Sequence, residues 1–233
     1  MASAALAHDI VGDVHGCDAE LVELLGRLGY GDERAGFRAP PGRQLVFVGD
    51  LIDRGPRIPE VVERVRALVG AGDAVCLLGN HEFQLLEHLQ GRAPLAWGLA
   101  ETLEQYEARE ASDFEALLGF ARELPWKLEL DEGRLLVTHA GLPEDLQATD
   151  SALARRFALY GSRDGARRID WAPDYAGTAR VVYGHTPRPD PQWVQRTLCV
   201  DTGCVYGGAL TALRYPELEL VSVPAQRTWY GHD

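Results

Sequence analysis

Short apolar runs alternate with helical patterns over the first part of the chain. Three apolar runs are each four or five residues long, at residues 8–11, 45–48 and 74–78. After each run, apolar side chains recur at helical spacing, over residues 18–28, 59–69 and 83–89. Short apolar strands that alternate with helices are typical of parallel strands covered on both faces. The first half of the chain therefore predicts an α/β fold.

The pattern changes in the second half. Residues 95–124 predict a helical insert of two or three short helices that packs on the core and forms part of a cleft wall. Two hairpins are predicted, at residues 126–130 with 135–138 and at residues 209–215 with 217–223. Between them we predict a helix, a polar basic loop and two strands, at residues 151–160, 162–168, 181–183 and 197–200. No linker divides the sequence, so we predict one domain over residues 1–233.

Polar side chains follow the first apolar run directly, in the motif Gly12-Asp13-Val14-His15-Gly16. Alternate side chains of an extended chain share a face, so Asp13 and His15 are expected to point the same way. The flanking glycines allow a sharp turn and a close approach to a bound group. A carboxylate and an imidazole that converge in this way form half of a divalent-metal site. The alternative is a surface turn with an incidental aspartate and histidine.

The other predicted strands end in similar clusters of polar residues. These clusters are Gly49-Asp50-Leu51-Ile52-Asp53-Arg54-Gly55, Gly79-Asn80-His81-Glu82, His139-Ala140-Gly141 and Gly184-His185. In open α/β sheets, ligands bind beyond the carboxyl ends of the strands. The clusters are therefore expected to supply the other half of the site that begins at Asp13 and His15.

Composition limits the function classes. The 233 residues include 46% hydrophobic and 25% charged side chains, as in an ordinary globular protein, with a net charge of −12. Duplex nucleic-acid binding over a broad face is not expected, although bound cations can still attract phosphate substrates. The four cysteines form no Cys-x-x-Cys pair and are interpreted as small buried residues in a reducing compartment. Because we recognise neither a signal segment nor an apolar stretch of roughly 20 residues, we expect a cytoplasmic protein with no membrane partner.

Taken in order, the five motifs resemble those of the calcineurin-like metallophosphoesterases. The Asp53-Arg54-Gly55 ending of the second motif is similar to the phosphoprotein-phosphatase branch of that family. The resemblance extends over residues 8–213. It implies an α/β fold built as a two-sheet β-sandwich flanked by helices, with a dinuclear metal site at the strand ends. It also implies a hydrolase in which a metal-bridging water attacks a phosphate ester or anhydride.

The resemblance implies a ligand role for six residues of the motifs. Asp13 and His15 would hold the first metal, and Asp50 would bridge both metals. The second metal would take its remaining ligands from Asn80, His139 and His185. Carboxylate, imidazole and amide ligands suit manganese, which we expect first, and also iron, zinc, cobalt or nickel.

Three further motif residues would act on the substrate. Arg54 resembles the phosphate clamp of the family, because its planar guanidinium can donate two parallel hydrogen bonds. His81 resembles the general acid that protonates the leaving oxygen, with Asp53 orienting it. The alternatives are a surface salt bridge for Arg54 and a hydrogen-bonded core histidine for His81. No metal-binding role is expected for the histidines outside the motifs, His8, His88 and His232.

Residues 201–214 bear on the substrate. They resemble a segment shared by the symmetrical diadenosine tetraphosphatases of bacteria and the phosphatase module of bacterial polynucleotide kinase-phosphatase. The resemblance implies that Asp201 either orients a ligand histidine or meets the substrate. In the predicted basic loop, Arg168 and then Arg163 are candidates for a second substrate-binding arginine, with a solvated surface as the alternative. The expected substrates are diadenosine tetraphosphate, or phosphorylated or cyclic nucleotides and RNA ends.

Two other functions stay open. A protein serine/threonine phosphatase would use the same chemistry on a phosphoprotein, and only the substrate groove would differ. A non-catalytic binding protein on the same fold would be expected to have lost a metal ligand, whereas the motif positions named above are all intact.

Overall fold

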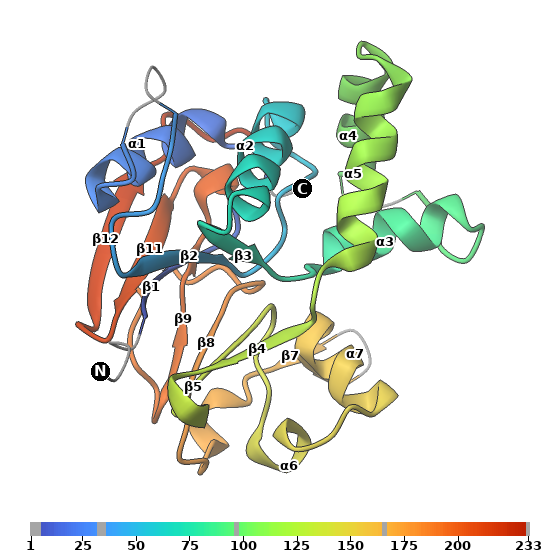
Figure 1. The fold of residues 1–233 in the computed structure, drawn as a ribbon. Helices are drawn as coiled ribbons and strands as arrows, with labels where there is room; N and C mark the ends of the chain where they lie inside the picture. The colour runs from blue at the N-terminus through green and yellow to red at the C-terminus, as the bar shows by residue number, and fades with distance from the viewer. Residues whose placement is uncertain (1–5, 32–35, 96–97, 165–166, 232–233) are drawn as a thin grey trace.

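The computed structural model describes residues 6–31, 36–95, 98–164 and 167–231, in which the strands form two main sheets (Figure 1). The larger sheet has six strands in the order β10-β11-β1-β2-β3, with β12 paired to β11. Its strands are β1 (Ala7–Val11), β2 (Arg43–Phe47), β3 (Ala74–Cys76), β10 (Asp201–Thr202), β11 (Ala209–Tyr215) and β12 (Glu219–Pro224). Strands β1, β2 and β3 are parallel to one another, which confirms the interpretation of the three apolar runs.

The smaller sheet has four strands in the order β4-β5-β8-β9. Its strands are β4 (Lys127–Leu130), β5 (Leu135–Thr138), β8 (Arg180–Tyr183) and β9 (Thr197–Cys199). The predicted hairpin of β4 and β5 is present, and β5, β8 and β9 are parallel. The carboxyl ends of β5 and β8 can therefore meet the carboxyl ends of β1 to β3 where the two sheets face each other.

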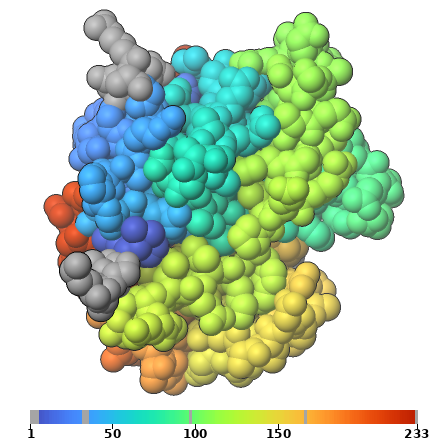
Figure 2. Space-filling model, in the orientation of Figure 1, coloured from blue at the N-terminus to red at the C-terminus, as the bar shows by residue number. Residues whose placement is uncertain are grey.

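Helices cover both outer faces of the sheets. They are α1 (Asp18–Leu28), α2 (Ile58–Gly70), α3 (Asn80–Leu89), α4 (Leu99–Glu107), α5 (Ala111–Glu123), α6 (Glu144–Gln147) and α7 (Ala152–Tyr160). In Figure 1, α1 and α2 lie over the larger sheet, α3 to α5 stand at one side, and α6 and α7 lie beside the smaller sheet. Figure 2 shows the same division at the surface, with the blue and teal N-terminal segments above the yellow and orange ones.

Neighbouring residues of the central strands pack into different layers of the core. Ile10 and Val46 lie between the two sheets, whereas Val11, Leu45 and Phe47 pack with the apolar faces of α1 and α2. Successive strand side chains point to opposite faces, and here both faces are covered. This is why β1 and β2 read as continuous apolar runs rather than as an alternation of apolar and polar residues.

Three segments differ from the sequence prediction. Helix α3 begins at Asn80 rather than at residue 83, so the third motif forms the first turn of the helix. The predicted loop over residues 162–168 is a hairpin of β6 (Ser162–Asp164) and β7 (Arg167–Ile169). Residues 201–202, where no strand was predicted, form β10 of the larger sheet directly after the predicted strand at residues 197–200, which is present as β9 of the smaller sheet. The hairpin was not predicted because its side chains are mostly exposed and do not alternate between apolar and polar residues.

Helices α4 and α5 occupy most of the predicted helical insert, in which residues 96–97 lie outside the described residues. No helix in the described part of the chain is long and apolar enough to cross a membrane. The four cysteines are buried and free, in agreement with their interpretation as small core residues.

Candidate metal centre

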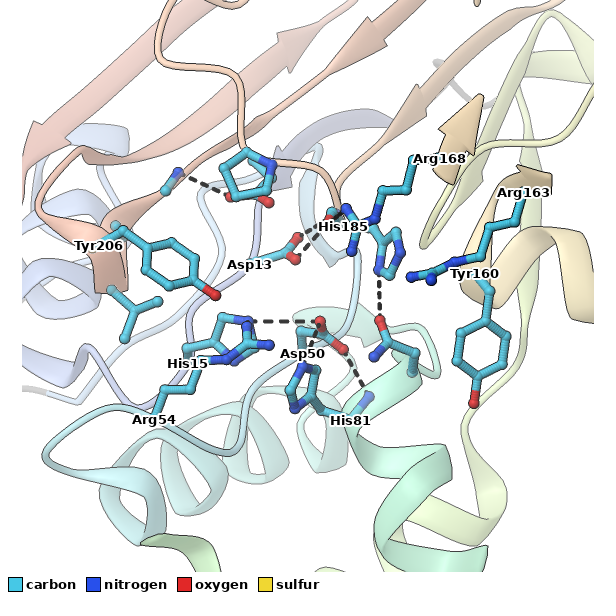
Figure 3. A pocket seen from close by; sticks show the side chains of 16 residues that line it. Asp13, His15, Asp50, Arg54, His81, Tyr160, Arg163, Arg168, His185 and Tyr206 are labelled. Atoms are coloured by element: carbon cyan, nitrogen blue, oxygen red, sulfur yellow. Dashed lines mark hydrogen bonds and ion pairs between the residues drawn. The ribbon is translucent and has the colours of Figure 1, made fainter. Parts of the chain in front are cut away.

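Polar side chains from the ends of five strands meet in one cluster, and most of them line a cavity of about 380 Å³ (Figure 3). Those after β1, β2 and β3 come from the larger sheet, and those after β5 and β8 come from the smaller sheet. The six predicted metal ligands are all buried there: Asp13, His15, Asp50, Asn80, His139 and His185. The site therefore depends on how the two sheets are packed together.

Asn80, His139 and His185 bring three ligand atoms into contact. His139 Nε2 lies 2.8 Å from Asn80 Oδ1 and 3.2 Å from His185 Nδ1, and His185 Nδ1 lies 2.6 Å from Asn80 Oδ1. His139 Nδ1 lies 3.0 Å from the carbonyl oxygen of Val48, which can only accept, so Nδ1 carries the proton and Nε2 presents a lone pair. Burial lowers the pKa of His139, which favours this neutral form. Lone pairs that converge in this way fit a bound cation.

Asp50 lies between His139 and His15. Its Oδ2 atom is 3.4 Å from His139 Nε2 and 3.6 Å from His15 Nε2. His15 is oriented as His139 is, because its Nδ1 donates to the carbonyl oxygen of Ile52 over 2.7 Å. Burial by itself would raise the pKa of Asp50, but the surrounding histidines, His139 foremost, lower it below its ordinary value. An ionised carboxylate thus lies between two imidazole lone pairs, the place that a bridging ligand would take.

Two compact sets of ligand atoms share Asp50. In each set three side-chain atoms lie within 4.8 Å of one another, and the sets are His15 with Asp50 and His81, and Asp50 with His139 and His185. A shared carboxylate and nitrogen donors on both sides suit a pair of divalent cations.

Asp13 adds a further carboxylate to the site, although it lies outside both compact sets. It accepts hydrogen bonds of 3.1 and 3.2 Å from the backbone N–H of His185. Burial, and then the charges of Asp201 and Asp50, raise the pKa of Asp13 well above its ordinary value. Carboxylates crowded into a buried cavity repel one another unless cations balance their charge. The electrostatics of Asp13 therefore also fit a site for cations.

His81 is hydrogen-bonded to Asp53. Its Nδ1 donates to Asp53 Oδ2 over 2.5 Å, and its Nε2 lies on the side of the metal ligands, 3.9 Å from Asp50 Oδ2. Asp53 is itself held by Thr102 of α4, whose hydroxyl donates to Asp53 Oδ1 and accepts from the Asp53 backbone N–H. Sequence reasoning missed Thr102, because it lies 49 residues from Asp53 in a helix that carries no motif.

Glu82 is a second residue whose role the sequence did not reveal. Its buried carboxylate accepts backbone hydrogen bonds from Asp50 at 3.0 Å, Leu51 at 2.7 Å and Gly79 at 3.1 Å. Burial, and then the charge of Asp50, raise the pKa of Glu82 to about 7. Glu82 thus fixes the turn that presents Asp50. Its position at the end of the third motif was the available signal.

The backbone of the site is strained where it presents the functional side chains. Positive φ angles of 43° to 71° occur at five non-glycine residues, His15, Asp50, Asp53, Arg54 and His185. Such angles are uncommon for residues with a side chain and cluster at functional sites. The motif glycines allow this crowding, since a Cβ atom on Gly55 would lie 1.7 Å from the carbonyl oxygen of His15.

Arg54 lines the cavity beside His15, with Tyr206 nearby (Figure 3). Its Nη1 lies 2.8 Å from His15 Nε2. Its guanidinium carbon is 5.5 Å from the ring centre of Tyr206 and 5.9 Å from that of Tyr230. The aromatic rings support the stem of the guanidinium while one edge faces the cavity. A surface salt bridge, the alternative considered for Arg54, does not describe this position.

Arg163 and Arg168 also line the cavity, and they are directly opposed in the hairpin of β6 and β7. Arg168 Nη1 donates to the carbonyl oxygen of His185 over 3.1 Å and to Thr186 Oγ1 over 2.8 Å. Partial burial, and then the charge of Arg163, lower the pKa of Arg168. Opposed like charges destabilise a strand pair, so this arrangement points to an anion that would bind between them.

Asp201 lines the same cavity. Its Oδ1 accepts a hydrogen bond of 2.9 Å from the backbone N–H of Gly203. Burial and the charge of Asp50 raise the pKa of Asp201 to about 7, although the hydrogen bond from Gly203 by itself would lower it. The predicted site residues therefore lie together. Of the histidines expected to bind no metal, His88 contacts the carbonyl oxygen of Ala93, and His232 lies outside the described residues.

Known proteins resemble this chain over nearly its whole length. The family model for calcineurin-like phosphoesterases matches residues 9–232. The asymmetrical bis(5′-nucleosyl)-tetraphosphatase PrpE of Geobacillus sp. strain WCH70 is 42% identical over 229 residues, which cover 93% of this chain and 94% of the relative. PrpE of Anoxybacillus flavithermus is 41% identical over 232 residues, with 94% and 95% covered. These relatives are named asymmetrical, whereas residues 201–214 resemble a segment of the symmetrical subgroup.

Solved structures share the fold. A candidate diadenosine tetraphosphatase superposes with a TM-score of 0.69 at 26% identity, covering 97% of this chain and 96% of the other. A protein serine/threonine phosphatase from Saccharomyces cerevisiae has a TM-score of 0.68 over 98% of this chain and 82% of the other, and its 17% identity supports a common fold alone. The chain thus belongs to the calcineurin-like phosphoesterase family, and it is a metal-dependent phosphoesterase.

Proposed function

We propose that the protein hydrolyses dinucleoside tetraphosphates asymmetrically, into a nucleoside monophosphate and a nucleoside triphosphate. The observation that carries the proposal is the identity of 42% with an asymmetrical bis(5′-nucleosyl)-tetraphosphatase over 93% of the chain. The three guanidinium groups around the buried ligand cluster support it, because a tetraphosphate chain is highly anionic.

Six residues would hold two divalent cations, with Asp50 shared between them: Asp13, His15, Asp50, Asn80, His139 and His185. Manganese is our first expectation for both positions, since carboxylate, imidazole and amide donors suit it. When bound, such cations supply Lewis acidity at the phosphoryl oxygens and lower the pKa of water. The carbonyl groups of Ile52 and Val48 would keep the lone pairs of His15 and His139 directed at the cations.

Three arginines would bind and orient the phosphate chain. Arg54 reaches the cavity from the turn after β2, and Arg163 and Arg168 reach it from the hairpin at the opposite end (Figure 3). Guanidinium groups donate parallel hydrogen bonds to phosphate oxygens, so arginines at both ends can hold several phosphates at once. Asp201 lines the same cavity. It would meet the substrate or adjust the charge of the cavity.

His81 would act as the general acid. In the proposed step a water oxygen bonds to an outer phosphorus and releases a proton to solvent, the bond from that phosphorus to its bridging oxygen breaks, and the imidazole donates its Nε2 proton to the departing oxygen. Asp53 accepts from Nδ1, which holds the ring in place with its Nε2 on the side of the metal ligands. Thr102 would in turn keep Asp53 directed at His81.

A substrate panel tests the proposal. Purified protein would be assayed with manganese, cobalt and nickel on diadenosine tetraphosphate, 2′,3′-cyclic nucleotides, p-nitrophenyl phosphate and a phosphopeptide, with products separated by chromatography. We expect AMP and ATP in equal amounts from diadenosine tetraphosphate. Formation of ADP alone would contradict asymmetric cleavage. Phosphopeptide turnover far above nucleotide turnover would instead favour a protein serine/threonine phosphatase.

A further inference from the structure

A second cavity adjoins the metal centre on the side of α7. It has a volume of about 640 Å³, within the range of roughly 300–1,000 Å³ that is typical of small-molecule sites. Its walls come from the exposed face of α7 and the start of β6, and they include Leu153, Arg156, Phe157, Tyr160, Ser162 and Arg163. We call it the α7 cavity.

Two residues line both cavities, Tyr160 and Arg163. In Figure 3 they lie at one edge of the metal-centre cavity, and Tyr206 lies at the other edge with the ligand cluster between them. A ligand whose reacting phosphate lies at the cluster can therefore extend past Arg163 into the α7 cavity. Its remaining phosphates would pass the guanidinium group on the way.

The α7 cavity offers aromatic and aliphatic surface for a flat ring. Phe157 is braced by an edge contact with Trp171, with 6.0 Å between ring centres. Tyr160 is braced in the same way by Phe83 at 6.4 Å. Leu153 is a large apolar side chain left 64% exposed at the rim. Aromatic rings held in place by neighbours are the usual platform on which a nucleobase stacks.

Two arginines, Arg156 and Arg163, also line the cavity. Within the described residues, neither Arg156 nor Arg163 makes a hydrogen bond or an ion pair. By contrast, the neighbouring Arg155 of α7 does not line the cavity, and it pairs with Asp150 over 2.7 Å. Guanidinium groups beside aromatic rings suit a ligand that combines phosphates with a base.

We infer that the α7 cavity binds the nucleoside that is remote from the cleaved bond, an inference that rests on the proposed function. Cleavage of an outer anhydride places one nucleoside next to the metal centre and leaves the other at the end of a triphosphate chain. The α7 cavity lies beyond Arg163, where the end of such a chain would arrive. Occupation of this cavity would fix the substrate in the off-centre position that asymmetric cleavage requires.

The test compares three variants of helix α7 on two substrates. Leu153→Asp and Arg156→Ala alter exposed side chains of the α7 cavity, and Arg155→Ala is the matched control outside it. Each would be assayed on diadenosine tetraphosphate and on p-nitrophenyl phosphate, which has no nucleoside. We expect the ratio of kcat/KM on the first substrate to kcat/KM on the second to fall about tenfold in each cavity variant, mainly through a higher KM. The control should keep the wild-type ratio.

The outcomes separate the cavity assignment from the proposed function. If the wild-type protein makes AMP and ATP and both cavity variants keep the ratio of the control, the cavity assignment is overturned and the proposed function stands. If the wild-type protein hydrolyses p-nitrophenyl phosphate but not diadenosine tetraphosphate, both are overturned. A lower ratio in both cavity variants, with the control unchanged, supports the assignment.

Discussion

At the scale of residues, individual hydrogen bonds determine which histidine nitrogen carries the proton and how the ligand side chains are oriented. The carbonyl oxygens of Ile52 and Val48 can only accept, so they require a proton on Nδ1 of His15 and His139 and leave a lone pair on each Nε2. Glu82 accepts hydrogen bonds from the backbone N–H groups of three consecutive residues in the turn that presents Asp50, and from that of Gly79. The residues beside the ligands thus determine the tautomer and the orientation in which the ligands are presented.

Asp50→Ala should abolish activity, because this carboxylate lies between both groups of nitrogen ligands. We expect the variant to lose at least one of the two metals as well, measured by elemental analysis after dialysis. Asp145→Ala, at an exposed position of α6, serves as the control. An Asp50→Ala protein that keeps two metals per chain would contradict the bridging role.

His81→Ala should reduce the rate by about 10²–10⁴ on a substrate with a poor leaving group, such as phenyl phosphate. The loss should be smaller on p-nitrophenyl phosphate, since its leaving oxygen needs less protonation. The measurement is kcat on both substrates for the variant and the wild-type protein. Equal losses on the two would exclude His81 as the general acid.

At the scale of elements, the hairpin of β6 and β7 places two arginines at the cavity, although no sequence motif marks this segment. Pairing places Arg163 opposite Arg168 at the cavity, and Asp164 opposite Arg167 beside the turn. The second pair has opposite charges and stabilises the hairpin, whereas the first pair repels. The element therefore holds two positive charges at the site in a fixed geometry.

Arg163→Ala should lower kcat/KM on phosphate substrates by about 10- to 100-fold, as expected for the loss of a charge-assisted hydrogen bond. Arg167→Ala removes the same charge from the same hairpin, outside the residues that line the cavity, and should change kcat/KM less than threefold. Steady-state kinetics on diadenosine tetraphosphate measure both. Equal losses would mean that Arg163 acts only through the net charge of the hairpin.

At the scale of the whole molecule, the metal centre joins the two sheets. Asp13, Asp50 and Asn80 follow strands of the larger sheet, and His139 and His185 follow strands of the smaller one. Bound cations would therefore link two layers that otherwise meet through the apolar contacts between them, such as those of Val46 and Val182. Ligands that bind the folded state alone increase its stability.

Removal of metal by a chelator should accordingly lower the melting temperature by about 5–10 °C, if metal at 100 times its Kd contributes about 2.7 kcal/mol. Differential scanning calorimetry before and after dialysis measures the shift, and added manganese should reverse it. The Asp50→Ala variant, which is expected to lose at least one metal, is the control and should show a smaller shift. A melting temperature that does not respond to chelator would mean that the cations do not couple the sheets.

Much of the fold and site could be predicted because the determinants are local. The apolar runs of β1 to β3 are consecutive residues, and α1 spans residues 18–28 as its spacing predicted. The motif residues directly follow their strands. Parallel strands in a sheet bring their carboxyl ends to one edge, so adjacency in sequence became adjacency in space. The extent of the domain and the cytoplasmic location stay predictions.

The sequence by itself predicted most of the elements, the family and a set of candidate ligand residues, because each depends on short spacings along the chain. Tertiary structure alone decided the rest. Thr102 meets Asp53 across 49 residues, Arg163 meets Arg168 through strand pairing, and the α7 cavity opens beside the metal centre. Such contacts depend on how sheets and helices pack, and no local pattern records packing between distant segments.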